Sequence, residues 1–142
     1  MPRLKPADRE TAAQRAGGHC EYCRSPEDLS PSPFSIEHVN PAALRGATEL
    51  ENLALSCQGC NNHKYTCTDA LDRISGISVP LFNPRRDRWA DHFGWADDFT
   101  LIVGLTPVGR VTVEPLKLKR RGVVNLRRAL RALGRHPPDD GR

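Results

Sequence analysis

Aromatic residues and long apolar runs are both scarce in this chain of 142 residues. Aromatic side chains make up 6% of it and apolar residues 38%, so its hydrophobic core must be small. No run approaches the roughly eighteen consecutive apolar residues of a membrane-spanning helix, and the first residues lack the apolar stretch of a signal peptide. We therefore expect a single cytoplasmic domain over residues 1–142, without a membrane partner. The few aromatic residues at Trp89, Phe93 and Trp95 are expected in its core.

The chain has five cysteines, and four of them form two Cys-x-x-Cys pairs. The pairs are Cys20/Cys23 and Cys57/Cys60. In a reducing compartment such pairs indicate metal ligands rather than disulfides. Four thiolates in two pairs are typical of a structural zinc site, which leaves no coordination position open for catalysis.

The segment Phe34-Ser-Ile-Glu-His-Val-Asn40 lies among the 33 residues between the two pairs. Its alternation of apolar and polar residues predicts a short, half-buried strand over residues 34–39. Neighbouring strand residues point to opposite faces, so Glu37 could bind a metal ion while His38 meets a substrate. A zinc ion bound by both pairs would hold this segment in place.

The remaining elements follow from periodicity and turn residues, and together they predict an α+β fold. They are helices over 7–16, 61–71 and 85–93, a hairpin of strands 99–103 and 110–113 around Thr106–Gly109, and a last helix over about 123–133. The last helix has one apolar face, formed by Val123, Leu126, Leu130 and Leu133.

Positive charge is concentrated in the second half of the chain. The net charge is +4, but residues 1–70 contain seven Lys/Arg against nine Asp/Glu, and residues 71–142 contain fourteen against eight. A basic surface favours an anionic partner such as a nucleic acid. The arginines Arg127, Arg128 and Arg131 of the last helix form either a solvated face or a phosphate-binding face, and the sequence leaves both open.

Five motifs in order resemble the HNH endonuclease family. They are Cys-x-x-Cys, Ile-Glu-His-Val, Asn-Leu-Ala-Leu, and Cys-x-x-Cys followed by Asn-x-x-Lys, within residues 20–64. The resemblance implies a zinc-pinned ββα-metal (HNH) core over 19–71. Residues 80–138 would form a basic C-terminal extension, with a hairpin and a helix, packed on that core. The implied reaction is divalent-metal-dependent hydrolysis of DNA phosphodiester bonds, with RNA as another substrate left open.

The resemblance also implies a role for individual residues. His38 takes the place of the general base, while Glu37 and Asn61 take those of the ligands of the catalytic ion. Asn52 would order the preceding loop and help to orient His38. Asn61 stands where the family has its eponymous last histidine, and an amide oxygen favours Mg²⁺ or Mn²⁺ over softer metals. The loop before Asn52 has one glycine, Gly46, where many family members have two adjacent glycines.

Several residues keep alternative interpretations. Lys64 stands where the family commonly has a lysine, near nucleic-acid phosphates or near the fold's own acidic groups. His63 is either a third ligand of the catalytic ion or a solvent-facing or phosphate-contacting residue. Asn61 could instead cap the helix that follows Cys60. His19 is an alternative zinc ligand, and Cys67 is expected to be a small buried apolar side chain.

Two other function classes remain beside the nuclease. One is a non-catalytic zinc module that binds nucleic acid, and the other is a zinc-stabilised protein-interaction domain. The joint occurrence of Glu37, His38, Asn52 and Asn61 favours the enzyme, because a binding module needs none of them. The basic second half argues against the protein-interaction domain. The sequence does not fix the oligomeric state.

Overall fold

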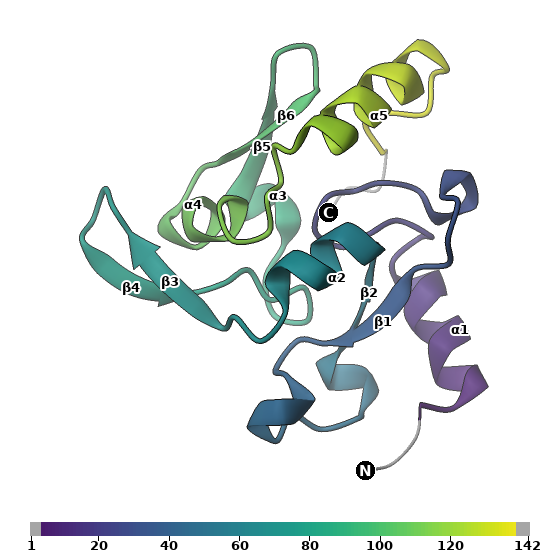
Figure 1. The fold of residues 1–142 in the computed structure, drawn as a ribbon, viewed down its shortest axis with the longest axis vertical. Coiled ribbons are helices and arrows are strands. Elements are labelled where there is room, and N and C mark those ends of the chain that lie inside the picture. Colours follow the sequence, from purple (N-terminus) through teal and green to yellow (C-terminus); the bar gives the residue numbers. More distant parts are fainter. Residues whose placement is uncertain (1–3, 139–142) are drawn as a thin grey trace.

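The computed structural model describes residues 4–138, in which short helices alternate with three antiparallel strand pairs (Figure 1). The helices are α1 (Pro6–Arg15), α2 (Gln58–Lys64), α3 (Trp89–His92), α4 (Pro107–Val113) and α5 (Arg121–Ala132). The strands are β1 (Ser35–His38), β2 (Leu53–Ser56), β3 (Asp69–Asp72), β4 (Ile77–Pro80), β5 (Phe93–Ala96) and β6 (Leu101–Gly104). Single 3-10 turns lie at Glu27–Leu29, Ala42–Leu44 and Leu50–Asn52. The fold is α+β, as the sequence predicts.

The first strand pair and the helix that follows it form the unit that carries the predicted site. β1 and β2 pair antiparallel, which sets Glu37 opposite Ala54 and His38 opposite Leu53. β2 is buried along its whole length; α1 contacts β2, and α2 contacts β1 (Figure 1). The strand predicted over residues 34–39 is confirmed. A hairpin followed directly by a helix is the ββα arrangement that the family resemblance implies.

Helix α2 differs at both ends from the helix predicted over residues 61–71. It begins earlier because Cys57 is its N-cap, with a sulfur that accepts a hydrogen bond from the backbone N–H three residues later. It ends at Lys64, because Tyr65 has a φ of 47°, outside the right-handed helical region. The chain then enters the hairpin of β3 and β4, which the sequence did not predict.

The hairpin predicted around Thr106–Gly109 is wrong. β6 pairs with the preceding strand β5, and the residues after it form helix α4. Pro107 occupies the first turn of α4, and the Thr106 hydroxyl accepts a hydrogen bond from the Gly109 N–H as the N-cap. Proline in the first turn and threonine at the N-cap are both favoured at helix starts. The Thr-Pro pair therefore starts a helix rather than a hairpin turn.

The C-terminal helix α5 is confirmed, but its buried face differs from the predicted apolar stripe. Val123 and Leu130 are buried, whereas Leu133 is 71% exposed. The third buried position is Arg127, whose guanidinium donates to three backbone carbonyls, including that of Cys23. Burial lowers the pKa of Arg127 to about 10. Carbonyl acceptors are what makes a buried guanidinium tolerable.

A single core joins the first and second halves of the chain. Trp89 and Phe93 are buried in it, and Trp95 packs against it, as the sequence predicts. The Trp89 indole donates to the Tyr22 carbonyl at 3.0 Å, and α4 contacts both the β3–β4 hairpin and β6. Of the helix predicted over residues 85–93, only α3 is helical. Within residues 4–138, no helix is long and apolar enough to cross a membrane.

Candidate metal centre and active site

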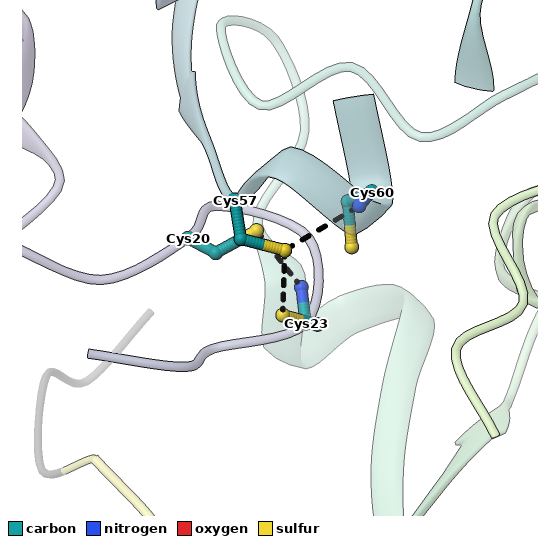
Figure 2. A group of neighbouring side chains, drawn as sticks. All are labelled: Cys20, Cys23, Cys57 and Cys60. Carbon is teal, nitrogen blue, oxygen red and sulfur yellow. Dashed lines mark hydrogen bonds between the residues drawn. The ribbon is translucent and has the colours of Figure 1, made fainter. Parts of the chain in front are cut away.

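The four cysteines of the two pairs point toward one another (Figure 2). Cys20 and Cys23 come from the segment after α1, Cys57 follows β2 directly, and Cys60 lies in the first turn of α2. All four sulfurs lie within 4.8 Å of one another, and those of Cys23 and Cys57 are 3.7 Å apart. Sulfurs around a tetrahedral zinc ion with bonds of about 2.3 Å are about 3.8 Å apart. The cluster therefore has the geometry to hold zinc.

Backbone N–H groups donate hydrogen bonds to two of these sulfurs. The Cys23 N–H donates to the Cys20 sulfur at 3.5 Å, and the Cys60 N–H donates to the Cys57 sulfur at 3.4 Å. His19, the alternative ligand, is not part of the cluster, and its Nδ1 lies 2.9 Å from a backbone carbonyl two residues earlier. Burial raises the pKa of the Cys20 thiol, so a metal ion that binds here has to displace protons.

Arg120 is a neighbour of this cluster that no sequence motif indicated. Its two terminal nitrogens each lie 3.6 Å from the Cys60 sulfur, and Nη2 lies 3.5 Å from that of Cys57. Burial opposes its charged form, but the cysteine sulfurs hold the pKa of Arg120 above its usual value. Gly59 makes this approach possible, because a Cβ there would lie 2.7 Å from Nη2. Arg120 is thus placed to offset the negative charge of a metal–thiolate centre.

Glu37 is the buried carboxylate of β1. Its side chain is 4% exposed, the Tyr22 hydroxyl donates to Oε1, and Lys64 Nζ lies 3.3 Å from Oε2. Burial raises the pKa of Glu37, and the charge of Lys64 and the bond from Tyr22 oppose this shift. Burial also raises the pKa of Tyr22 well above its usual value, so the phenol keeps the proton it donates.

His38 is half-buried and follows Glu37 in β1, where alternation directs the two side chains to opposite faces. The Nε2 atom of His38 lies 2.9 Å from the hydroxyl oxygen of Thr48. When Nε2 carries the proton, the Thr48 hydroxyl oxygen accepts a hydrogen bond from this N–H, and Nδ1 keeps a free lone pair. That is the form that a general base requires. Sequence reasoning missed Thr48, which is a polar residue of the loop between His38 and Asn52.

Asn52 closes the loop that carries Thr48. Its Oδ1 accepts from the Asn40 N–H at 2.8 Å, and its Nδ2 donates to the carbonyls of Asn40 at 3.0 Å and Ala47 at 2.8 Å. These three bonds tie the end of β1 to the residue before Thr48. Asn52 is thus placed to position the imidazole through the loop, while the direct contact comes from Thr48.

Asn61 lies inside α2, three residues before Lys64 and therefore on the same helix face. Because Cys57 is the N-cap, Asn61 does not cap this helix. Within residues 4–138, no hydrogen bond joins the half-buried Asn61 side chain to Glu37 or to any other group. An amide oxygen and a carboxylate are hard donors that fit Mg²⁺ or Mn²⁺, with water and phosphate oxygens as further ligands.

Comparison with known families bears on this same stretch of the chain. Residues 20–66, from the first cysteine of the cluster to just beyond α2, match the HNH endonuclease family model. This segment is an HNH endonuclease domain. The match spans about a third of the chain. No curated protein and no solved structure matches the chain.

Two basic residues predicted to contact nucleic acid are buried. The Lys64 side chain of the HNH domain is 2% exposed, and Nζ donates to the Val39 carbonyl at 2.9 Å besides pairing with Glu37. Of the two positions left open for Lys64, the structure selects the one beside the fold's own acidic group. Arg127 is 1% exposed. Neither side chain can reach a phosphate, whereas Arg128, Arg131 and His63 are exposed.

The loop of the HNH domain has a conformation that needs only one glycine. A Cβ on Gly46 would lie 1.7 Å from the Asn40 carbonyl oxygen, so no side chain fits there. The preceding residue, Arg45, itself takes a φ of 68°, a conformation that glycine adopts more readily. Arginine thus stands where the second glycine of other members would be expected, and the loop still closes.

Proposed function

We propose that this protein is an endonuclease that hydrolyses DNA phosphodiester bonds with the help of a divalent ion. The HNH domain indicates a nuclease or a nucleic-acid-related function. The observation that carries the proposal is the hydrogen bond between His38 and Thr48, which holds the imidazole in place and, when Nε2 carries the proton, leaves Nδ1 available as a base. A module that only binds nucleic acid does not need an imidazole held in this way.

Each residue of the site has a separate task in this proposal. His38 Nδ1 takes a proton from the water that attacks the phosphorus. Thr48 and Asn52 hold the imidazole in place. Glu37 and Asn61 would bind a Mg²⁺ or Mn²⁺ ion, which supplies Lewis-acid stabilisation of the charge that develops on the phosphate oxygens.

We also propose that Cys20, Cys23, Cys57 and Cys60 bind a structural zinc ion. Four sulfur ligands leave no position for water or substrate, so this ion stabilises the fold and takes no part in the reaction. The ion would hold the segment before β1 against the junction of β2 and α2. A cytoplasmic location would keep these thiols reduced.

Replacing Arg120 with Gln should weaken zinc binding without preventing folding. The variant loses the charged donors to the sulfurs of Cys57 and Cys60. Removing such outer partners of metal ligands typically lowers metal affinity by about 10–100-fold. A chelator-competition titration measures the change, and Arg121→Gln, a change of the exposed next residue, is the control. Equal zinc affinity in the two variants would show that Arg120 merely packs beside the cluster.

A plasmid assay tests the proposed reaction directly. Zinc-loaded protein is incubated with supercoiled DNA, with no added ion, with Mg²⁺ or with Mn²⁺, and single-stranded DNA and RNA are compared in parallel. We expect DNA cleavage only with an added ion, and the zinc content is measured after each incubation. Binding of nucleic acid without any cleavage would instead support the second candidate, the non-catalytic binding module, which the exposed Arg128 and Arg131 favour.

Replacing Arg128 and Arg131 with Ala should weaken DNA binding equally for all sequences. Both side chains are exposed on α5, beside Asp97 and Asp98, which limit how many phosphates they attract. Each lost phosphate contact should reduce the slope of log affinity against log salt by about 0.9. Binding titrations at several salt concentrations give this slope. Arg135→Ala is the control, since Arg135 already pairs with Asp28. An unchanged slope in the double variant would show that this face of α5 is exposed to solvent and does not contact phosphates.

Asn61→Ala should raise the Mg²⁺ concentration needed for cleavage and lower the rate, because a neutral oxygen ligand is lost. Zinc content should stay the same, since Cys60 belongs to the other metal site. Asn61→His should be partly active and should shift the preference toward Mn²⁺, Co²⁺ or Ni²⁺. Cleavage is measured against metal concentration, with the exposed neighbour Asn62→Ala as the control. A normal Mg²⁺ dependence in Asn61→Ala would rule out the ligand role.

A further inference from the structure

Each buried carboxylate in residues 4–138 is already neutralised by a basic side chain. The pairs are Glu37 with Lys64, Glu21 with Arg85, and Asp72 with Arg110. Within the same residues, Glu37 belongs to no group of three or more possible metal-binding side chains, and the nearby carboxylate of Glu21 is itself paired with Arg85. The interior of the HNH domain therefore offers no surplus negative charge for a divalent cation.

The contacts of Lys64 fix its ammonium group beside Glu37. Nζ lies 3.3 Å from Oε2 and donates to the Val39 carbonyl at 2.9 Å, and both side chains are almost fully buried. The other carboxylate oxygen accepts from the Tyr22 hydroxyl. One acidic ligand and one adjacent ammonium give a net charge of zero, and the Asn61 amide adds none. Such a site attracts a divalent ion weakly, because the ammonium repels it at short range.

We propose that the divalent ion and the nucleic acid bind to the site as a pair, and that Lys64 disfavours binding of the ion alone. A bound phosphodiester adds the negative charge and the oxygen ligands that the protein does not supply, as is common for magnesium sites. This inference rests on the proposed nuclease function and specifies how its ion site is controlled. It gives the buried Lys64 a role that does not require contact with the substrate.

Binding measurements on a cleavage-deficient protein test this coupling. In zinc-loaded His38→Ala protein, Mn²⁺ binding is followed by electron paramagnetic resonance with and without a short DNA duplex, and binding to the duplex alone is subtracted. We expect Mn²⁺ to bind at least about tenfold more tightly when DNA is present. By linkage, Mn²⁺ must raise the DNA affinity by the same factor. Divalent ions otherwise compete with phosphate contacts, so such a rise identifies a specific site.

Two further variants test which side chains cause the coupling between the ion and the DNA. Glu37→Gln in the His38→Ala background should abolish it, because the one charged ligand is gone. Lys64→Met keeps most of the side-chain volume without the charge and should tighten Mn²⁺ binding in the absence of DNA by at least about tenfold. Lys119→Met, which removes an exposed lysine, is the matched control and should leave that affinity unchanged.

Each result supports or overturns the inference. Equal Mn²⁺ affinity with and without DNA overturns it, and so does an unchanged affinity in folded Lys64→Met protein. If Lys64→Met does not fold, the linkage measured in His38→Ala protein decides, because it does not depend on that variant. Coupling together with a wild-type protein that cuts no nucleic acid would overturn the nuclease proposal alone. Cleavage without coupling would overturn this inference and leave the nuclease proposal standing.

Discussion

Replacement of Cys57 by Ser should leave the protein without zinc and largely unfolded. Cys57 belongs to the four-cysteine cluster, is the N-cap of α2 and directly follows β2, so one side chain joins three parts of the HNH domain. Structural zinc in small domains contributes apparent binding free energies of about 10–16 kcal/mol at pH 7. Whole domains are stable by only about 5–15 kcal/mol. A small core cannot compensate for a loss of this size.

Cys67→Ser is the matched control for this prediction. Cys67 lies outside the cluster, is half-buried rather than buried as the sequence predicts, and its thiol donates to the Asp69 carbonyl at 3.4 Å. A serine hydroxyl can make the same bond, so this variant should retain one zinc per chain and the wild-type melting temperature. Elemental analysis and thermal denaturation followed by circular dichroism measure both. A folded, zinc-free Cys57→Ser protein would contradict the structural role of the ion.

The features that could be predicted from the sequence are those encoded by residues close together along the chain. The alternation around Glu37 and His38 specified β1, and the spacing of the two Cys-x-x-Cys pairs specified the cluster. Both depend on local geometry, since a strand has a period of two and two thiolates at that spacing can reach one ion. The family match covers this same region of the chain.

The features that could not be predicted depend on contacts between distant segments. Arg127 on an amphipathic helix has the pattern of a solvated residue, and only the carbonyls of Cys23, Thr100 and Leu118 make its burial tolerable. The position of Lys64 is set by Glu37, 27 positions earlier in the chain, and by other segments that pack around the pair. For these residues, tertiary hydrogen bonds override the local preference for the surface.

The role of Thr48 illustrates how the site depends on a contact that no motif contains. The family resemblance implied that Asn52 orients the imidazole, whereas the hydrogen bond to His38 comes from Thr48. Asn52 contributes indirectly, because it fixes the backbone of the adjacent Ala47. Because Thr48 belongs to none of the motifs, the sequence pattern alone did not single it out.

His38→Ala should reduce DNA cleavage by about 10²–10⁴-fold, the usual contribution of a positioned general base. The fold should survive, because His38 is only half-buried and, within residues 4–138, its side chain makes one hydrogen bond, to Thr48. Zinc content should be unchanged, since His38 is not part of the cysteine cluster. DNA affinity should also stay near wild type, since the lost group acts on the attacking water rather than on the phosphate. Single-turnover cleavage of a plasmid in Mg²⁺, at saturating protein, measures the rate separately from binding.

His63→Ala is the matched control for this variant, because His63 is an exposed histidine of the neighbouring helix α2. If His63 contacts a phosphate, its loss should change the affinity for DNA but leave the single-turnover rate within a few-fold of wild type. The cleavage rate of Thr48→Val should lie between those of the two variants, because the imidazole remains but loses the hydrogen bond that holds it in place. A His38→Ala protein that cuts as fast as wild type would mean that the imidazole is not the base. The binding-module interpretation would then replace the nuclease.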